Sequence, residues 1–396
     1  MLQSMNMKYM EEHGIYVELN NIDPTEAYDQ FKRMSQLGEA PDLLLLDNSW
    51  VREFAVLGYL LPVDAYFTNE SQSDQIEPIM EQLKWNGYIW GIPKDIDPYV
   101  LVWNDKALNH GKGLKPSAKF EEFYALCRML ANPEEGRHAL YVNPNDPYAL
   151  ISLIWQLGGS WIDRASGSPR LSDSVTGHML SQLFDPKQTQ GADNKSNMSG
   201  KPAMKDGIGN EAALAAGESG DAPTGPILYR DADNEDQAWE LLKQGDLAMM
   251  VTTMSKYRMK GTADIRYMEF DSKEDGKSGG WLRGRSFVVS SRTELEDEAM
   301  GWVKAMTSPE SQQNMLETTG QLPVVKSLYL NSFSNDYAYL RHTAKVTEQG
   351  RVFPPDPFLP EKLEQLQQEL PKLWNGDIDV KSFIERVDSG WRGNSL

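Results

Sequence analysis

The sequence contains very little cysteine and histidine. Cys127 is the only cysteine among 396 residues, so the chain can form neither an internal disulfide nor a multi-cysteine metal cluster. The five histidines include no H-E-x-x-H arrangement, which argues against a zinc hydrolase. We therefore expect no metal and no other cofactor.

Long apolar runs and positive charge are also scarce. The longest purely aliphatic run is Leu43–Leu46, far below the roughly 20 residues that a membrane-spanning helix needs. The 39 basic residues are outnumbered by 58 acidic ones, which gives a formal net charge of −19. A charge of this sign repels phosphate backbones and anionic lipid surfaces, so we expect no nucleic-acid partner.

Aromatic side chains with a polar edge are plentiful instead. The chain has 11 Trp and 16 Tyr beside 12 Phe. For any single Trp, packing in a core is the simpler explanation. The excess as a group favours a half-hydrated site for a ligand with apolar faces, such as a sugar, because Trp and Tyr stack on such faces while their polar edges meet water.

The first fifty residues predict a helix followed by a strand–helix–strand unit. Met1–Met10 has no apolar core typical of a signal peptide and resembles a helix already in progress, which Gly14 ends. Ile15–Leu19 and Leu43–Leu46 are the strand candidates, with a helix between them that opens at Asp23. Such a unit implies parallel strands, whose carboxyl ends hold ligands in open sheets.

The second of those strand ends carries Asp47, Asn48, Ser49 and Trp50. A polar cluster with an indole at this edge predicts ligand contact. An equally good interpretation is that Asn48 or Ser49 only caps the next helix.

A hairpin is predicted at Trp85–Pro93, because Asn-Gly lies between two aromatic runs. We expect Lys94–Asp97 to be a polar loop before a strand at Tyr99–Trp103. Asp95 and Asp97 on that loop match two functions. They are either the acid and base of a glycosidase or acceptors for sugar hydroxyl groups, and the sequence does not give their separation.

The rest of the chain predicts further helices, two strands and a long insertion. The predicted helices are Phe120–Leu130, Tyr148–Leu157, Asn234–Gln244, one that begins with a capping box at Thr293 and Glu296, one that begins at Ser308, Pro360–Trp374 and Val380–Val387. The predicted strands are Leu247–Thr252 and Ser286–Ser290, and Lys256–Asp275 is a connecting stretch. Asp185–Gly225 is polar and poor in large apolar residues, which predicts a flexible insertion.

Eight short stretches, in this order along the chain, together resemble the extracellular solute-binding proteins of ABC sugar importers, the family that includes maltose-binding protein. The stretches are Ala40–Leu46, Gly58–Val63, Asn86–Pro93, Leu101–Asn104, Leu157–Trp161, Gln244–Met250, Thr307–Gln312 and Gly320–Pro323. The resemblance implies an α/β fold of the type II periplasmic-binding-protein class, with two lobes, a hinge and a ligand cleft between the lobes.

The resemblance also implies the division of the chain and the residues of the cleft. Residues 1–103 and 266–306 would form the N-terminal lobe, and residues 104–265 and 307–396 the C-terminal lobe, with the insertion at 185–225. The cleft residues carried over by position are Asp47, Asn48, Trp50, Asp95, Asp97, Tyr148, Tyr257, Trp281 and Arg283. Of these, Trp50 and Trp281 would stack on the sugar.

The function implied is capture of a carbohydrate by hinge closure and delivery to the transmembrane permease of an ABC transporter. Such a protein is a monomer outside the cytoplasm, extracellular or periplasmic, often tethered as a lipoprotein, and is not an enzyme. Two features depart from the family: the chain starts inside the first helix, without a signal peptide and without a first strand, and it carries the 185–225 insertion. The alternatives are a glycoside hydrolase that uses Asp95 and Asp97, and a sensor or scaffold lobe without ligand-induced closure.

Overall fold

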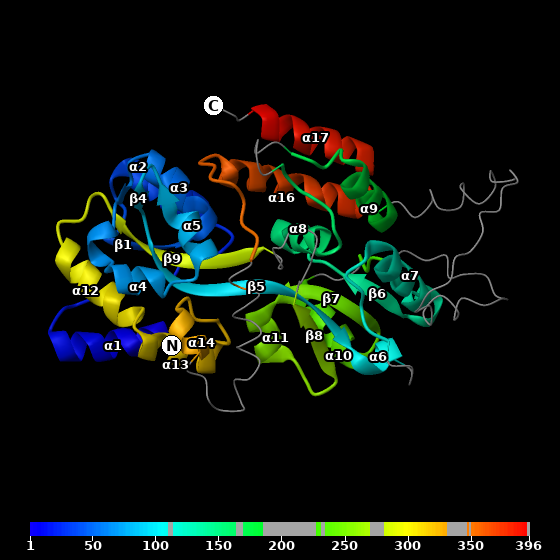
Figure 1. Ribbon diagram of the computed structural model, residues 1–396, viewed down its shortest axis with the longest axis horizontal. Helices are drawn as coiled ribbons and strands as arrows, with labels where there is room; N and C mark the ends of the chain where they lie inside the picture. Colours follow the sequence, from blue (N-terminus) through cyan, green and yellow to red (C-terminus); the bar gives the residue numbers. More distant parts are fainter. Residues whose placement is uncertain are drawn as a thin grey trace, which may run out of the picture.

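One long strand connects the two halves of this protein. The computed structural model describes residues 1–109, 114–163, 169–184, 227–230, 234–269, 281–330, 347 and 350–393. They form two α/β lobes joined by β5 (Ile92–Asn104) (Figure 1). From Ile92 to Pro98 this strand pairs with β9 (Leu282–Ser290), and from Tyr99 to Asn104 it pairs with other strands of the second lobe. The boundary between the lobes on β5 is therefore at Pro98 and Tyr99.

The strands form one sheet that runs through both lobes. Its order is β1 (Leu43–Asp47), β9, β5, β7 (Leu247–Thr253) and β6 (His138–Tyr141), with β2 (Leu60–Leu61) beside β9 and β8 (Ile265–Glu269) beside β5. The pairs within this sheet are antiparallel, apart from β6 with β7. A short separate hairpin, β3 (Lys84–Trp85) with β4 (Tyr88–Ile89), lies in the first lobe.

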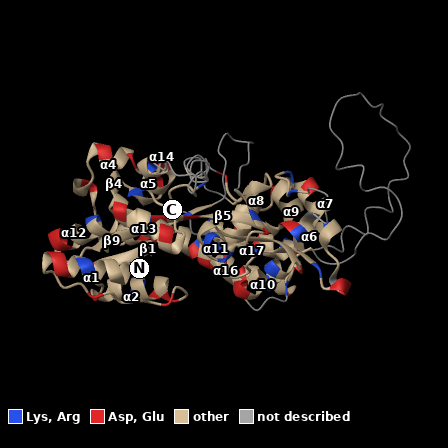
Figure 2. Cartoon of the chain, turned by 90° about the horizontal axis from the view of Figure 1, so that it is seen from below, with Lys and Arg blue, Asp and Glu red and all other residues tan. Residues whose placement is uncertain are grey.

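Helices cover the sheet in both lobes, and Figure 2 shows α1 and α12 at one end of the long axis and α6, α7 and α9 at the other. The first lobe contains α1 (Leu2–His13), α2 (Ala27–Leu37), α3 (Asn48–Val56), η1 (Asp64–Tyr66), α4 (Asn69–Ser73), α5 (Glu77–Leu83) and α12 (Glu296–Met306). The second contains α6 (Asp105–Asn109), α7 (Phe120–Leu130), η2 (Pro133–Glu135), α8 (Pro147–Gln156), α9 (Ser174–Phe184), α10 (Glu235–Gln244), α11 (Met254–Lys260), α16 (Leu359–Asn375) and α17 (Val380–Gly393).

Two further helices, α13 (Pro309–Thr319) and α14 (Lys326–Leu330), contact the first lobe. Leu322 forms a bridge with Ile96 of β5, and Val325 forms one with Gln75. The family resemblance predicts that residues 307–396 belong to the second lobe, and the exact division of this part of the chain between the lobes stays a prediction.

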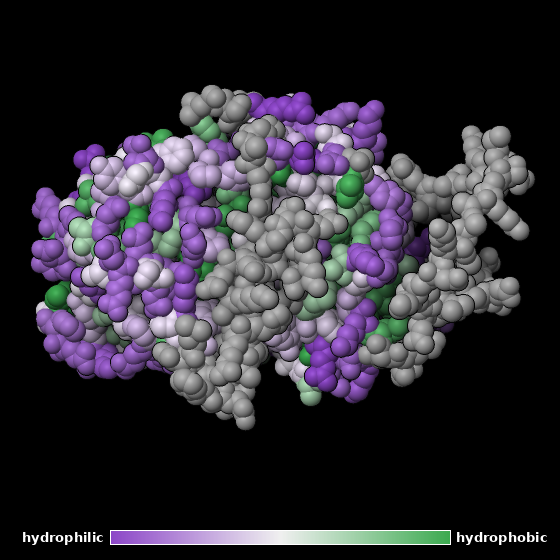
Figure 3. Space-filling view, viewed as in Figure 1, coloured by the Kyte–Doolittle hydropathy of each residue, from purple (hydrophilic) through white to green (hydrophobic). Residues whose placement is uncertain are grey.

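The hydrophobic core is continuous across the lobes on one face of the sheet. One cluster of buried side chains lies in the second lobe, among α7, α8, α9, α16, α17 and the sheet. The other fills the first lobe and continues onto the face of β5 and β7 that α10 covers, where Trp239 is fully buried. Hydrophilic residues cover much of the described face in Figure 3. No helix in the described part of the chain is long and apolar enough to cross a membrane.

Most local predictions are confirmed. Gly14 and Gly38 end α1 and α2 in the left-handed region, at φ 66° and 72°. Asn86 and Gly87 also have positive φ, as the two-residue hairpin turn requires. Ser308 caps α13 through its side chain. The helices expected at α7, α8, α10, α16 and α17 and the strands expected at β1, β7 and β9 are present. The predicted insertion at 185–225 lies outside the described residues.

The predicted parallel strand–helix–strand unit is wrong. Ile15–Leu19 forms no strand, and β1 pairs antiparallel with β9. The side chains of Ile15, Val17 and Leu19 do pack against the first-lobe core, alternating with exposed residues as a strand would. A strand also needs a neighbouring backbone, and in the described residues none pairs with this segment.

Three other expectations need correction. Lys94–Asp97 is part of β5 and not a loop: Lys94 occupies a bulge, and Asp95 finds a charged partner, Arg285, on β9. The stretch that begins at Lys256 contains most of α11 and all of β8, and is not merely a connection. Thr293 and Glu296 form no capping box, since the Thr293 hydroxyl accepts a bond from the Leu295 amide and donates to Asp42.

Gly284 of β9 tests how tightly the lobe junction is packed. A Cβ at this position would lie 2.7 Å from Asn48 Nδ2 and 3.0 Å from the Asp95 carbonyl oxygen. We expect Gly284→Ala to lower the free energy of unfolding by about 1–3 kcal/mol through overpacking. The control is Gly177→Ala in α9, where the nearest atom is 3.4 Å away, and it should be neutral or slightly stabilising. Urea denaturation of the wild type and both variants measures these changes. A Gly284→Ala variant as stable as the wild type would contradict the close packing at the junction.

Candidate functional site

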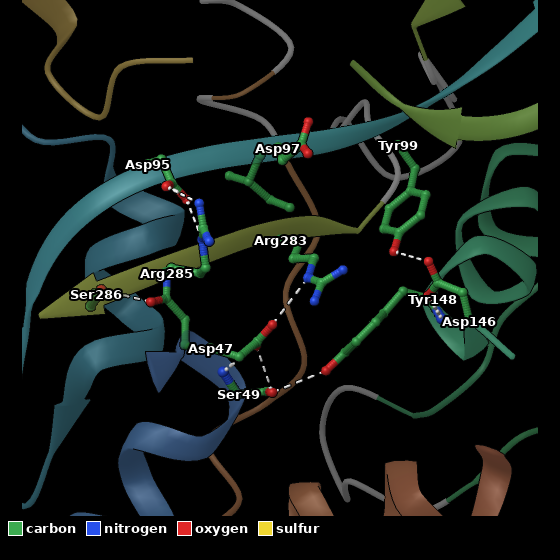
Figure 4. A network of polar contacts seen from close by, with 12 residues as sticks. Asp47, Ser49, Asp95, Asp97, Tyr99, Asp146, Tyr148, Arg283, Arg285 and Ser286 are labelled. Atoms are coloured by element: carbon green, nitrogen blue, oxygen red, sulfur yellow. Dashed lines mark hydrogen bonds and ion pairs between the residues drawn. The ribbon is translucent and has the colours of Figure 1, made fainter. Parts of the chain in front are cut away.

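A polar network lies where β1, β5 and β9 meet the first turns of α3 and α8 (Figure 4). Asp47 ends β1 and caps α3: its Oδ1 accepts bonds from the Ser49 amide at 3.0 Å and the Ser49 hydroxyl at 2.7 Å. The cap is therefore Asp47, and not Asn48 or Ser49. The other carboxylate oxygen of Asp47 accepts from Arg283 Nε at 3.1 Å.

This network joins the two lobes through Ser49 and Tyr148. Ser49 Oγ of α3 lies 3.0 Å from the hydroxyl oxygen of Tyr148 in the first turn of α8. Because the single hydroxyl proton of Ser49 is donated to Asp47, the Tyr148 hydroxyl is the donor across the junction. Asp146 caps α8 by accepting from the Tyr148 amide, and it also accepts from the Tyr99 hydroxyl of β5 at 2.6 Å. Helix α8 is thereby oriented by the shared strand.

Aromatic rings support Tyr148 from the second lobe. The rings of Tyr148 and Trp281 are stacked, with centroids 5.2 Å apart and planes inclined by 15°. The Arg283 guanidinium carbon lies 5.8 Å from the Tyr148 ring centroid. Trp281 is only 1% exposed, and its amide donates to Ser152 Oγ of α8. In this structure Trp281 therefore packs beneath Tyr148, and its predicted stacking on a ligand stays untested.

Asp95 is held in a buried charged cluster. Its carboxylate accepts from Lys94 Nζ at 2.5 Å and takes two bonds from Arg285, the residue paired with it on β9. Burial alone would raise the pKa of Asp95, but the Lys94 ammonium and the Arg285 guanidinium outweigh burial and lower the pKa to about 2. The side chain is thus an ionised anchor.

Asp97 ties β5 to helix α11 of the second lobe. Its two carboxylate oxygens accept from the amide of Ser255 at 2.9 Å and from the Ser255 hydroxyl at 2.6 Å. Burial raises the pKa of Asp97, and the bonds from Ser255 oppose the rise. Both oxygens are used by the protein itself, so the main role visible for Asp97 is to position α11.

The remaining predicted residues lie around this network. Asn48 is buried, and its Oδ1 accepts from the Ser286 hydroxyl at 2.6 Å. Trp50 is half-buried and packs on Tyr28 in the first lobe, with ring centroids 5.4 Å apart. Tyr257 of α11 packs on Tyr267, with centroids 4.7 Å apart.

The structure links six of the nine predicted residues at the junction through one another or through Ser49, Ser286 and Arg285: Asp47, Asn48, Asp95, Tyr148, Trp281 and Arg283. Sequence reasoning missed Ser49 as the link between lobes, and also Tyr99, Asp146, Ser255 and Arg285. The spacing of two between Arg283 and Arg285 on a strand was the available signal for the last of these. No group of three or more His, Cys, Asp or Glu side chains in the described ranges is placed to hold a metal ion.

Comparison with known proteins identifies the family. The family model for bacterial extracellular solute-binding proteins matches residues 5–341. The chain belongs to that family. Among curated proteins, a maltotriose-binding protein of Pyrococcus abyssi is 22% identical over 139 residues, which span 35% of this chain and 29% of that protein. The aligned part is thus under a third of the relative's length.

Solved structures share the fold over nearly the whole chain. The maltose-bound MalE3 of T. maritima matches with a TM-score of 0.77 at 16% identity, covering 99% of this chain and 95% of that one. The GacH receptor of Streptomyces glaucescens, solved unliganded and with acarbose, matches with a TM-score of 0.75 at 19% identity, covering 99% and 93%. The two-lobed fold expected from the sequence, and the family, are confirmed.

The ion cluster around Asp95 yields a stability prediction. Asp95→Asn leaves the buried Lys94 and the half-buried Arg285 without their counter-charge, so we expect the free energy of unfolding to fall by about 3–5 kcal/mol. The folded-state pKa is depressed, so the contribution of Asp95 is present above its ordinary pKa near 4 and is lost as pH falls toward 2.

Chemical denaturation at several pH values measures both effects. The gap between wild type and Asp95→Asn should narrow as pH falls from about 4 to 2. Asp264→Asn is the control, because the Lys106–Asp264 pair has side chains 76% and 47% exposed and should contribute less than about 1 kcal/mol. A gap that stays constant through this pH range would contradict the depressed pKa.

Proposed function

We propose that this protein binds a carbohydrate between its two lobes and delivers it to the permease of an ABC importer. The observation that supports this most directly is the Tyr148–Ser49–Asp47–Arg283 chain, which brings polar and aromatic groups from both lobes to one place beside the shared strand. Among solved structures with this fold, T. maritima MalE3 holds maltose, the GacH receptor was solved with acarbose, and a solute-binding protein of Thermotoga lettingae holds α-D-tagatose.

Hinge closure is the mechanism we propose for the binding. The lobes share β5, and its pairing changes between Pro98 and Tyr99, so a small rotation there moves the strands of one lobe against those of the other. A ligand that contacts both lobes favours the closed arrangement by its difference in affinity for the two states. The closed form would then be the one that the permease recognises, outside the cytoplasm, with the protein acting as a monomer.

A glycoside hydrolase is less consistent with the two aspartates. A general acid must hold a proton near neutral pH, yet Lys94 and Arg285 keep the pKa of Asp95 at about 2. Asp97 accepts bonds from Ser255 at both oxygens. Asp95 is thus ionised at neutral pH, Asp97 is bound to α11 through both oxygens, and the named relatives are binding proteins. We therefore propose binding without chemistry.

Binding and hydrolysis are separated by one experiment on the same preparation. We expect titration calorimetry against mono- and oligosaccharides to find a ligand, and small-angle X-ray scattering to show a more compact protein when that ligand is bound. Reducing ends should not accumulate during incubation with oligosaccharides. Accumulation of reducing ends would instead favour a glycoside hydrolase. A ligand that binds without making the protein more compact would favour the sensor or scaffold alternative.

The link between lobes can be tested with Tyr148→Phe. This change keeps the ring on Trp281 and removes only the hydroxyl that bonds to Ser49, so we expect the dissociation constant to rise about two- to tenfold, as for the loss of one neutral hydrogen bond. Tyr88→Phe, on a hairpin residue that is 51% exposed, is the matched control. Unchanged affinity in Tyr148→Phe would remove the interlobe bond from the binding mechanism.

A further inference from the structure

Three ion pairs at the lobe junction are buried asymmetrically, unlike the Lys94–Asp95 pair, in which both side chains are buried. In the Arg283–Asp47 pair the arginine side chain is 40% exposed and the aspartate 5%. In the Arg285–Asp95 pair the values are 37% and 4%, and in the neighbouring Lys256–Glu235 pair they are 45% and 11%. In each pair the cation faces outward and the carboxylate lies beneath it. The accessible surface here is therefore rich in positive groups, on a chain whose net charge is −19.

Arg283 is held through Nε, and the end of its guanidinium has no bonding partner within the described part of the chain. Nε donates to Asp47, and the group lies over the Tyr148 ring, which is itself stacked on the buried Trp281. In Figure 4 the terminal nitrogens of Arg283 point toward the space between Tyr99 and Tyr148. Among the described residues no hydrogen-bond acceptor is found for these two nitrogens. They form the planar fork that binds a carboxylate through two parallel bonds.

The acceptor groups around Arg283 are already engaged. Both oxygens of Asp47, Asp95 and Asp97 accept bonds from protein donors. Asp146, the carboxyl group on the Tyr148 side, accepts from Tyr99 and from the Tyr148 amide; burial raises its pKa, against the opposing effect of Arg283. Each of these carboxylate oxygens thus already accepts a bond from the protein, whereas the terminal nitrogens of Arg283 donate to no acceptor in the described ranges, and such unused charged donors favour an anionic group.

We propose that the ligand of this site is an acidic sugar, and that the Arg283 fork, supported from beneath by the buried Tyr148 ring, binds its carboxylate. This inference rests on the proposed carbohydrate-binding function and narrows its ligand to uronate-type saccharides. The strongly negative chain slows the approach of an anion, so selectivity would come from the local cations and not from long-range attraction. Arg285 and Lys256 are two further half-exposed cations at this junction, each paired with a more deeply buried carboxylate.

The test compares an acidic trisaccharide with its methyl ester, from which it differs only in the carboxylate, and with a neutral trisaccharide. Trigalacturonate, its methyl ester and maltotriose are titrated into the protein by calorimetry at two salt concentrations. We expect trigalacturonate to bind roughly ten- to a hundredfold tighter than its methyl ester, because charge-assisted bonds are lost on esterification. Its affinity should fall as salt is raised, while the affinity of the ester should hardly change.

Variants assign the preference to Arg283. Arg283→Gln should remove the preference for the free acid and change the affinity for the ester less than about threefold, and Arg283→Lys should retain only part of the preference because it keeps charge without the fork. Arg292→Gln, an exposed arginine just beyond the other end of β9, is the control and should change neither affinity. If Arg283→Gln fails to fold because Asp47 loses its partner, the double variant Asp47→Asn/Arg283→Gln, which removes both charges, is used in place of the single variant.

The failures are distinguishable. The acidic-sugar inference would be overturned if maltotriose or the methyl ester bound as tightly as trigalacturonate, or more tightly, and if Arg283→Gln changed the affinities for the acid and the ester by the same factor. Carbohydrate binding as such would stand. The same inference would be overturned if glucose 6-phosphate bound more tightly than trigalacturonate. It would also be overturned if tartrate, which has carboxylates but no sugar ring, did so. No binding of any saccharide in a wider neutral and acidic panel would overturn the proposed function itself.

Discussion

The shared strand β5 is the constraint on which the whole arrangement depends. Its backbone is paired with β9 in the first lobe and with β7 and β8 in the second, so the hydrogen bonds of one element hold both halves of the molecule. The groups that meet at the junction are placed relative to this strand: Asp95, Asp97 and Tyr99 are on it, and Arg283 and Arg285 are opposite it. Changing the angle between the lobes therefore changes the surroundings of all of these side chains together.

Charge inside a strand requires compensation, and here the neighbouring strand supplies it. Arg285 is paired in register with Asp47 on one side and with Asp95 on the other; its guanidinium bonds to the Asp95 carboxylate, while the Asp47 carboxylate bonds to Arg283, two residues along the same strand. A buried ion cluster of this kind stabilises little compared with an apolar one, but the loss of any member is costly. Its main effect is to select one register and one orientation of β5 over alternatives.

What could be predicted from the sequence depended on local interactions. Gly14, Gly38, the Asn86-Gly87 turn and the Ser308 cap act on backbone within a few positions, and each was located correctly. The charged stretch around Asp95 was expected to be a loop, because its partner Arg285 is 190 residues away. Ile15–Leu19 has the side-chain alternation of a strand, yet pairing depends on a neighbouring backbone that alternation cannot reveal. The interlobe bond of Ser49 to Tyr148 is nonlocal in the same way.

The stack of Tyr148 on Trp281 has an optical consequence. Trp281 begins the segment that leads into β9 of the first lobe, while its indole packs among Tyr148, Trp155 and Phe353 of the second. Its dry surroundings favour blue-shifted emission, and the neighbouring Tyr148 and Trp155 rings lie close enough to exchange excitation energy with it. A displacement of α8 relative to β9 would alter both the wavelength and the yield. An intrinsic chromophore therefore lies at the junction of the lobes, where it would report any movement of one lobe against the other without an attached dye.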